Sequence, residues 1–277
     1  MSIQITTLSE NTAGRVNLLA EWGLSILIEA DDYQILLDTG LSFSAAYNAI
    51  TLGIDLSHMD KIVFSHGHFD HTGGLLHILK MLSGTVEVIA HPDIWTLKYA
   101  RRPEREEQYI GVPFPREAAE TLDASFNLTR EPVWISENIV TSGEIPMITE
   151  YEKIDPMLYV KEKGEFKPDP LWDDQALFLK SERGLIIILG CAHRGIINTI
   201  RHAQELTGVE SIYAVIGGTH LISASPQRMD STIAELLSFN VQKLGVSHCT
   251  GLPASAILAH MFGEVFFFNN AGTRINL

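Results

Sequence analysis

The sequence has little cysteine, no long apolar run and few cationic residues for its length. Only two of the 277 residues are cysteine, Cys191 and Cys249, which excludes a disulfide framework and fits a reducing compartment. No apolar run reaches the roughly 18 residues that a membrane span needs. Residues 1–15 also lack the basic start and apolar stretch of a secretory signal. We therefore expect a cytoplasmic protein that does not bind membranes.

Cationic residues are outnumbered by acidic ones. Lysine and arginine total 20 against 34 aspartates and glutamates, and the formal net charge is −14. This charge argues against non-specific binding to nucleic acid, although bound metal ions could still make a positive pocket for an anionic substrate. With 45% hydrophobic and 19% charged residues, the composition is that of an ordinary globular protein. We expect one domain over residues 1–277.

The most informative stretch is residues 65–74, which read SHGHFDHTGG. It lies between an apolar run that predicts a buried strand, residues 62–64, and a stretch with helical periodicity, residues 74–82. Three imidazoles and one carboxylate within six residues are costly to hold together unless a metal ion compensates them. Imidazole and carboxylate without thiolate suit zinc, iron(II) or manganese(II) better than calcium or an iron–sulfur cluster.

The spacing within this loop suggests two ions. In extended backbone His66 and His68 point to the same side, so they can share one ion. Asp70 and His71 follow the turn at Phe69 and would face a second ion. A surface loop with scattered histidines is the alternative. It is disfavoured because H-x-H-x-D-H followed by two glycines is far more specific than a single histidine.

At these residues the chain resembles the metallo-β-lactamase-fold superfamily. Residues 24–29 and 33–40 are similar to that superfamily's opening hairpin and D-T-G turn. Three later segments, residues 190–195, 217–221 and 247–251, resemble a subgroup named for dihydropterin-ribofuranosylaminobenzene-phosphate synthase, a pterin-transferring enzyme. The resemblance implies an α/β (α+β) fold, a four-layer αββα sandwich with mixed, largely antiparallel sheets.

The periodicity of the rest of the chain fits alternating strands and helices. Residues 3–39 predict an antiparallel meander. Further elements are expected as helices over 43–52, 195–206, 229–239 and 253–262 and as strands over 86–90, 176–180, 185–189, 212–216, 243–247 and 265–268. Periodicity lapses over residues 95–150, which carry charges, prolines and aromatics. This segment is either a solvated surface or a lid that selects substrate.

The resemblance also implies a set of metal ligands. We assign His66, His68 and His193 to one ion, and Asp70, His71 and His248 to the other, because His193 and His248 each follow an apolar strand. The implied cofactors are two divalent ions. Zinc is favoured, with iron and manganese as alternatives.

The sequence departs from the superfamily pattern at two places. The superfamily commonly has a further histidine where this chain has residues 172–175, and Gly-Asp where it has Gly190 and Cys191. Cys191 could bind or bridge as a thiolate, or could be a small buried residue beside the site. Asp173 or Asp174 could bind instead. A solvent molecule alone could also bridge the ions.

Other residues are expected to act beside the ions. His220 should emerge at the same sheet edge as His193, where we favour a catalytic contact to substrate over a role as ligand, and Asp70 is the other expected catalytic residue. Asp38 is expected to hold a metal-bound imidazole through its N–H group. Arg194 and the first backbone amides of the following helix are expected to contact a phosphate of the substrate. Thr250 is also expected to contact the substrate.

The leading functional hypothesis is a metal-dependent hydrolase. The ions would lower the pKa of a bound water and polarise an ester, lactone or phosphodiester of a small, anionic molecule. The resemblance implies an alternative, a transferase that joins a pterin-methyl diphosphate to an arylamine-ribose phosphate. A non-catalytic or redox metal-binding module is a third possibility. The sequence leaves the oligomeric state open, a homo-oligomer included.

Overall fold

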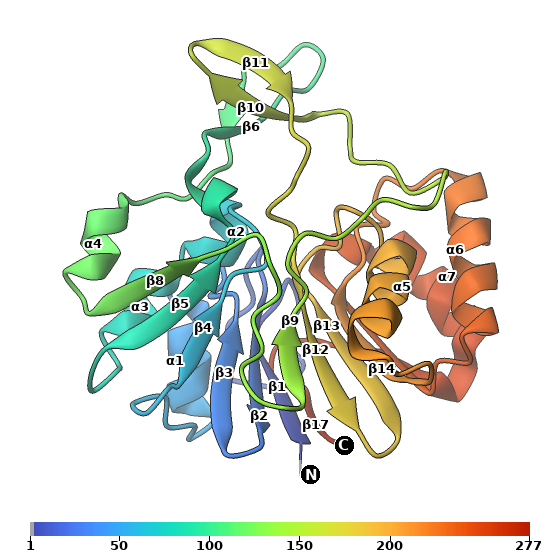
Figure 1. Cartoon of the computed structure of the whole chain (residues 1–277), viewed down its shortest axis with the longest axis horizontal. Helices are drawn as coiled ribbons and strands as arrows, with labels where there is room; N and C mark the ends of the chain where they lie inside the picture. Colours follow the sequence, from blue (N-terminus) through green and yellow to red (C-terminus); the bar gives the residue numbers. More distant parts are fainter. Residues whose placement is uncertain (1–2) are drawn as a thin grey trace. The chain divides into compact units, whose positions relative to one another are not determined.

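A computed structural model describes residues 3–277, whose contacts divide into two compact units. Unit 1 comprises Glu131–Ile154 and Asp174–Asn269, and unit 2 comprises residues 3–130, Asp155–Asp173 and Asn270–Leu277. Each unit is built on its own large sheet (Figure 1). The single domain expected from the sequence stays a prediction.

The main sheet of unit 2 has the strand order β17-β1-β2-β3-β4-β5-β8. The ladders from β17 to β3 are antiparallel and those from β3 to β8 are parallel. In chain order the strands are β1 (Ile3–Ser9), β2 (Ser25–Ala30), β3 (Tyr33–Leu37), β4 (Lys61–Val63), β5 (Val86–Ala90), β8 (Ala124–Leu128) and β17 (Arg274–Asn276). The parallel half brings the carboxyl ends of β3, β4 and β5 to one edge.

Helices cover one face of this sheet (Figure 1). They are α1 (Ser44–Thr51), α2 (Phe69–Thr72), α3 (Leu75–Leu79) and α4 (Arg116–Glu120). Leu27 of β2 and Leu36 of β3 point to this face, where they share a buried cluster with Ala49 of α1 and Ile78 of α3. Because side chains alternate along a strand, their neighbours point to the other face.

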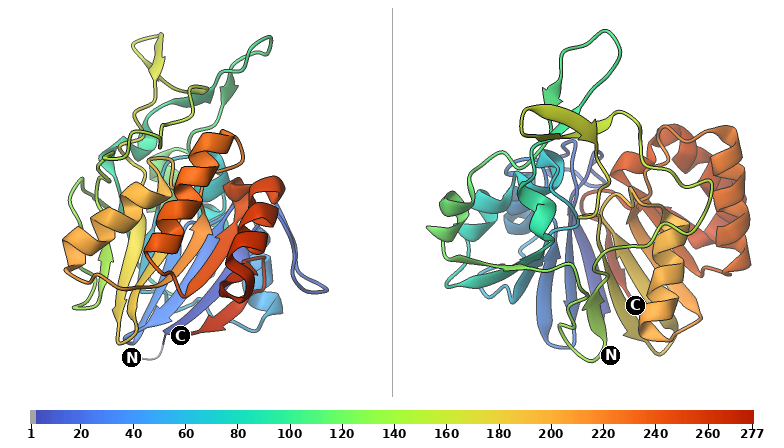
Figure 2. Two further views of the ribbon diagram at one scale, coloured as in Figure 1. Left: turned by 90° about the vertical axis from the view of Figure 1, so that its right-hand side faces the viewer. Right: turned by 45° about the horizontal axis from the view of Figure 1, so that its top comes forward.

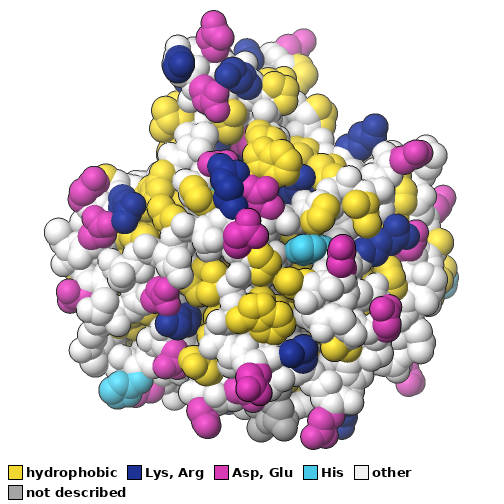
Figure 3. Space-filling view, viewed as in Figure 1, with side chains coloured by type: hydrophobic (Ala, Val, Ile, Leu, Met, Phe, Trp, Pro, Cys, Tyr) yellow, Lys and Arg dark blue, Asp and Glu magenta, His cyan; other side chains and the backbone are white. Residues whose placement is uncertain are grey.

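A small antiparallel sheet also belongs to unit 2, with the order β11-β10-β6-β7. Its strands are β6 (Lys98–Ala100), β7 (Gln108–Tyr109), β10 (Leu158–Glu162) and β11 (Glu165–Pro168), and η1 (Pro92–Trp95) precedes it. At the top of Figure 3, cationic, acidic and hydrophobic side chains gather over this sheet. Arg101 lies 4.5 Å and Lys161 5.0 Å from the ring centre of Phe166. A lid function for residues 95–150 stays a prediction.

Unit 1 is built on a sheet with the order β16-β15-β14-β13-β12-β9. The ladders from β16 to β13 are parallel and those from β13 to β9 antiparallel. The strands are β9 (Ile139–Thr141), β12 (Ala176–Ser181), β13 (Gly184–Leu189), β14 (Ile212–Gly218), β15 (Lys243–Ser247) and β16 (Phe266–Phe268). The parallel half again brings several strand ends to one edge.

The helices of unit 1 lie on one face of this sheet (Figure 2). They are α5 (Ile196–Thr207), α6 (Pro226–Ser238) and α7 (Leu252–Phe262), with the short η2 (His248–Thr250) and η3 (Gly263–Val265). Leu185 and Ile187 of β13 share a buried cluster with Ile200 of α5, Ile233 of α6 and Leu258 of α7. Every residue of β13 is buried, so this strand is central to its unit.

The predicted mixed α/β fold is confirmed, with antiparallel ladders outnumbering parallel ones among the described strands. The sequence missed β6, β7, α4, β8, β9, the β10–β11 hairpin and β17. The helix predicted over residues 74–82 is shorter, since α3 ends at Leu79. Within residues 3–277, no helix combines the length and apolar character that crossing a membrane requires.

Candidate metal centre

The predicted histidine loop lies at the parallel edge of unit 2. Strands β3 and β4 are parallel neighbours, so Asp38, which follows β3, lies beside Ser65 and His66, which follow β4. The backbone N–H of Asp38 donates to Val63 O at 2.9 Å. Asp38 has a φ of +58°, in the left-handed region that aspartate tolerates better than most residues.

The carboxylate of Asp38 organises the loop. One oxygen accepts a hydrogen bond from His71 Nδ1 at 2.7 Å and another from Ser65 Oγ at 2.6 Å, while the second oxygen accepts from Ser65 N at 2.8 Å. Ser65 Oγ lies 2.9 Å from His66 Nδ1. Asp38, Ser65 and His71 are completely buried. One carboxylate therefore holds His71 directly and His66 through Ser65.

These hydrogen bonds fix the tautomers of two histidines. The carboxylate oxygen accepts this bond, so His71 carries a proton on Nδ1, and in the neutral ring its Nε2 is unprotonated. The Ser65 hydroxyl donates to Asp38, so its oxygen accepts from Nδ1 of His66, and in the neutral ring Nε2 of His66 is likewise unprotonated. An unprotonated Nε2 whose partner nitrogen donates to a carboxylate or hydroxyl is the usual arrangement of a metal-binding histidine.

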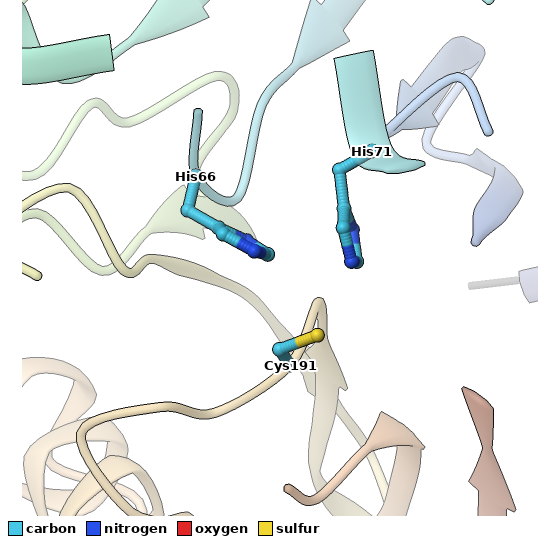
Figure 4. A group of neighbouring side chains, drawn as sticks. All are labelled: His66, His71 and Cys191. Carbon is cyan, nitrogen blue, oxygen red and sulfur yellow. The ribbon is translucent and has the colours of Figure 1, made fainter. Parts of the chain in front are cut away.

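The donor atoms of the loop fit metal ions. His66 Nε2 lies 2.9 Å from His68 Nδ1, and two nitrogens bound to one tetrahedral zinc ion lie about 3.3 Å apart. The ring centres of His66 and His71 are 4.2 Å apart, and Figure 4 shows both rings turned toward the same space. A carboxylate oxygen of Asp70 lies within 4.8 Å of a His71 nitrogen. The four residues thus bring donor atoms close together, and their division between two ions stays a prediction.

Electrostatics keep this loop in its metal-binding form. Burial lowers the pKa of His68 to about 3, and the positive charge of Lys98 adds to the effect. The imidazole of His68 is therefore neutral at physiological pH. Neutral imidazole is the form that binds a metal ion.

The glycines of the motif let the loop pack against its neighbours. A Cβ atom at Gly67 would lie 2.3 Å from Ile94 O, and one at Gly74 would lie 2.0 Å from Thr39 O. Neither position has room for a side chain. These contacts explain why glycine stands at both positions.

Asp173, one of the candidate ligands, has other partners. One of its oxygens accepts a hydrogen bond from the backbone N–H of Gly67 at 2.8 Å, and the other accepts from Lys98 Nζ at 2.9 Å. Lys98 also donates to Asp169 at 2.8 Å, and all three side chains are buried. Asp173 therefore supports the backbone between His66 and His68. In unit 1, Asp174 accepts from the backbone N–H of Arg194 at 2.8 Å.

The parallel edge of unit 1 carries a second set of predicted residues. Strands β13, β14 and β15 are parallel neighbours, and the loops after them carry His193, His220 and His248. Ala192, His220 and His248 have φ values of +50°, +47° and +52°. Left-handed backbone at residues other than glycine stores strain and is concentrated at functional sites. Each of the three loops carries one such residue.

Thiol and imidazole groups meet at this edge of unit 1. Donor atoms of Cys191, His193 and His220 lie within 4.8 Å of one another, as do those of Cys191, His248 and Cys249. Figure 4 shows Cys191 on the loop that follows β13. The ring centres of His193 and His220 are 4.2 Å apart, so His220 as ligand and as substrate contact both stay open.

The Cys249 thiol is strongly perturbed. Burial raises its pKa, but hydrogen bonds with Cys191 and His220 and the charges of His248 and His220 outweigh burial, so the pKa lies well below the ordinary value. The backbone N–H of His220 donates to Cys249 Sγ at 3.3 Å. The sequence alone gave no sign of this contact.

Two expected substrate contacts have structural partners. The Thr250 hydroxyl oxygen accepts from the backbone N–H of Thr219 at 3.2 Å and lies 2.9 Å from the Thr219 hydroxyl, so it joins two of the loops. Arg194 is buried, and its Nε donates to Ile145 O at 2.6 Å. Roles for both in substrate binding stay predictions.

The predicted phosphate site at the start of α5 needs a correction. The buried carboxylate of Glu152 accepts hydrogen bonds from the backbone N–H groups of Ile197 and Asn198, both at 2.9 Å. A Cβ atom at Gly195 would lie 2.2 Å from the same carboxylate. Glu152 thus occupies the position where a phosphate would bind. A negatively charged side chain is favourable there, because the N-terminus of a helix carries partial positive charge.

Several supporting residues were missed by sequence reasoning. Ser65 could have been suspected, because it lies between the strand and the first histidine. Lys98, Asp169 and Glu152 reach their partners across long sequence separations, and no local pattern marks them. Cys249 follows a predicted ligand, but its contact with the loop of Cys191 depends on strand order.

Comparison with known proteins identifies the family of the chain. The family model described as the metallo-beta-lactamase superfamily matches residues 23–195. The chain is 35% identical to 7,8-dihydropterin-6-methyl-4-(beta-D-ribofuranosyl)-aminobenzene-5'-phosphate synthase of Methanocaldococcus jannaschii, over 98% of this chain and 95% of that protein. It is also 31% identical to an uncharacterized protein of that organism, over 95% and 96% of the two chains.

A solved structure agrees with these relatives. It is described as a metal-dependent hydrolase of the beta-lactamase superfamily and matches with a TM-score of 0.85 and 26% identity, over 99% of each chain. Family model, relatives and fold therefore point the same way. The chain belongs to the metallo-β-lactamase superfamily and, within it, to the group that includes the M. jannaschii synthase.

Proposed function

We propose that the chain is a metal-dependent enzyme that hydrolyses an ester, lactone or phosphodiester bond of a small molecule. The proposed ligands are His66, His68 and His193 for one divalent ion and Asp70, His71 and His248 for the other. The observation that carries the proposal is the hydrogen bonding of Asp38, which directly and through Ser65 engages Nδ1 of two histidines and so leaves Nε2 of each neutral ring as the nitrogen that can bind an ion.

The ions, when bound, would supply Lewis acidity and a water of lowered pKa. The chain's own residues prepare the site. Asp38 and Ser65 fix the orientation of two imidazoles before any ion binds, and Asp173 fixes the backbone of Gly67 between them. His220, on a loop with strained backbone, is proposed to donate a hydrogen bond to the leaving group or to a developing negative charge.

A transferase is the second candidate, and the 35% identity to the M. jannaschii synthase favours it. In that case an arylamine would attack in place of water and a diphosphate would leave. Such substrates need donors for their phosphates. The first amides of α5 already bind Glu152, so these donors would have to come from elsewhere in the chain.

Purified protein should first be analysed for bound metal, and then assayed with nitrophenyl phosphodiesters, lactones, and a pterin diphosphate with an arylamine-ribose phosphate. Metal-dependent turnover of the first two classes supports the hydrolase. Turnover of the pterin pair alone supports the transferase and contradicts hydrolysis. Metal binding with no turnover of any of them contradicts both and favours a metal-binding module. His77→Ala changes an exposed histidine on α3 and is the control variant, which should keep the metal content of wild type.

A further inference from the structure

Both cysteines of the chain lie at the edge of unit 1 that carries the predicted histidines. Cys191 is on the loop after β13, and Cys249 is in the short helix after β15. Both are 3% exposed. The Cys249 thiol donates to Cys191 O at 3.5 Å. The two loops are thus in direct contact across β14, the strand between them.

Gly218 at the end of β14 makes this contact possible. A Cβ atom there would lie 2.7 Å from Cys249 Sγ and 3.3 Å from Cys191 Cα. It would also lie 2.3 Å from Gly190 O, whose hydrogen bond with Gly218 N is 3.0 Å long. A side chain at this position would separate the loop of Cys191 from the rest of the edge.

Cys191 is the residue that the two donor clusters of this edge share. Its Sγ lies within 4.8 Å of donor atoms of His193 and His220, and also within 4.8 Å of donor atoms of His248 and Cys249. In a tetrahedral zinc site, sulfur and nitrogen ligand atoms lie about 3.5 Å apart. Movements of about an ångström would therefore place Cys191 Sγ in the coordination sphere of an ion at His193 and of one at His248.

Charge also favours a thiolate here. Two divalent ions a few ångströms apart repel each other, so an anionic group between them stabilises the pair. The donor clusters of this edge hold three imidazoles and two thiols, and a thiol is the group among them that becomes an anion on binding. Buried cysteine is more often a small apolar residue. Here, however, imidazole nitrogens from loops with left-handed backbone lie within 4.8 Å of Cys191 Sγ.

We propose that Cys191 loses its thiol proton to solvent and binds as a thiolate shared by the ion at His193 and the ion at His248. The inference rests on the metal dependence in the proposed function. Each ion then gains a fourth protein ligand. A shared thiolate favours thiophilic metals such as zinc, cobalt(II) and iron(II), and it disfavours manganese and magnesium.

The test uses the full chain loaded with cobalt(II), whose bond to a thiolate gives a sulfur-to-metal absorption band in the near ultraviolet. Wild type should show this band and magnetic coupling between two ions. Cys191→Ser should lose both. Cys249→Ser removes the neighbouring thiol and is the matched control, so it should keep the band. Cys191→Asp should bind two coupled ions without the band, because a carboxylate also bridges.

Zinc-loaded wild type gives a measurement that needs no variant. X-ray absorption should show sulfur at about 2.3 Å from zinc, beside nitrogen and oxygen at about 2.0–2.2 Å.

Removing the thiolate in Cys191→Ser should lower zinc affinity at least about tenfold, since the loss of a residue that only supports a ligand costs 10- to 100-fold.

The contradicting results separate this inference from the proposed function. Two bound ions with no sulfur signal, or a band lost in Cys249→Ser and kept in Cys191→Ser, would overturn the role of Cys191 and leave metal-dependent catalysis intact. A wild-type chain that binds no cobalt or zinc at all would overturn both.

Discussion

At the scale of single residues, the site depends on one buried carboxylate. Asp38 accepts three hydrogen bonds, one from His71 and two from Ser65, and so sets the tautomers of His71 and His66. An amide in its place could accept on one side only, because its nitrogen donates. The geometry and the proton positions of the loop therefore change together when Asp38 changes.

Asp38→Asn should lower metal affinity about 10- to 100-fold while leaving the fold intact, because it disturbs the partners of the ligands and not the core. Competition with a chelator measures the affinity, and circular dichroism reports the fold. Asp60→Asn is the control, since Asp60 is exposed and accepts one hydrogen bond, from Gln34 N at 2.7 Å. Equal metal affinity in the two variants would contradict the role of Asp38.

His220→Ala separates a substrate contact from a metal ligand. We expect full metal stoichiometry and a loss of kcat of about 10² to 10⁴, the usual effect of removing a proton donor or acceptor. Metal analysis and steady-state kinetics on the substrate found above provide the two readings. A fall in stoichiometry would instead make His220 a ligand beside His193, which its ring centre approaches to 4.2 Å.

Sequence patterns identify the candidate metal ligands better than the residues that hold other groups in place. His66, His68, Asp70 and His71 form a local motif, so they could be named without a structure. Glu152 caps α5 from 45 residues away, and nothing at either end marks the pair. The predicted phosphate site failed for this reason, because an open helix start and a capped one look the same in sequence.

At the scale of elements, strand β6 links the small sheet to the histidine loop. Lys98 of β6 is 1% exposed and lies between Asp169 and Asp173, and Asp173 in turn holds Gly67 N. The ion pairs raise the pKa of Lys98 above its ordinary value although burial lowers it. Removing the ammonium would leave two buried carboxylates without a counter-charge.

Lys98→Met should therefore destabilise the protein by about 3–5 kcal/mol, the usual cost of breaking a buried ion pair, and should also weaken metal binding. Lys167→Met is the control, because its ion pair with Glu162 is of similar length, 2.7 Å, but is exposed, so water screens it and its loss should change stability little. Urea unfolding and chelator competition measure the two effects. If both variants were equally stable, β6 would not support the loop.

The cap of α5 predicts an unusual pH dependence. Burial raises the pKa of Glu152 above 4.5, although hydrogen bonds from Ile197 and Asn198 oppose this. The native protein then binds the proton more readily than the unfolded chain, so this residue's contribution to stability falls as the pH rises through the window above 4.5.

Glu152→Gln tests this sign, because the amide does not titrate. The stability of wild type relative to the variant should decrease from mildly acidic to neutral pH, as measured by urea unfolding across that range. An increase over the same range would mean that the hydrogen bonds outweigh burial and that the pKa is lowered.

Long periodic elements were predicted well and short ones were not. The sequence placed α5 within a residue of its observed bounds, because its apolar spacing ends at Gly208, which has a left-handed φ of +70°. The strands β6, β7 and β17 have three residues or fewer, too short for a period to show. The short helix α2, Phe69–Thr72, lies in the stretch that was predicted as a loop, and its four residues are likewise too few for a period to show.

At the scale of the whole molecule, the fold class followed from the motif and its resemblance, and the relatives confirm the family. Substrate did not follow in the same way. Periodicity lapses over residues 95–150, and contacts between distant segments leave no local pattern, so the sequence does not name the residues that select substrate. Family membership therefore indicates the chemistry of the site more closely than it indicates the identity of the substrate.

Metal content tests the central claim most directly. Elemental analysis of purified wild type should find two divalent ions per chain. His68→Ala should bind fewer ions while keeping the wild-type circular dichroism spectrum, since loop ligands contribute to metal affinity more than to core packing. His77→Ala, an exposed histidine on α3, should keep both ions. A wild-type chain without bound ions, or a His68→Ala variant that retains the full number, would contradict the account.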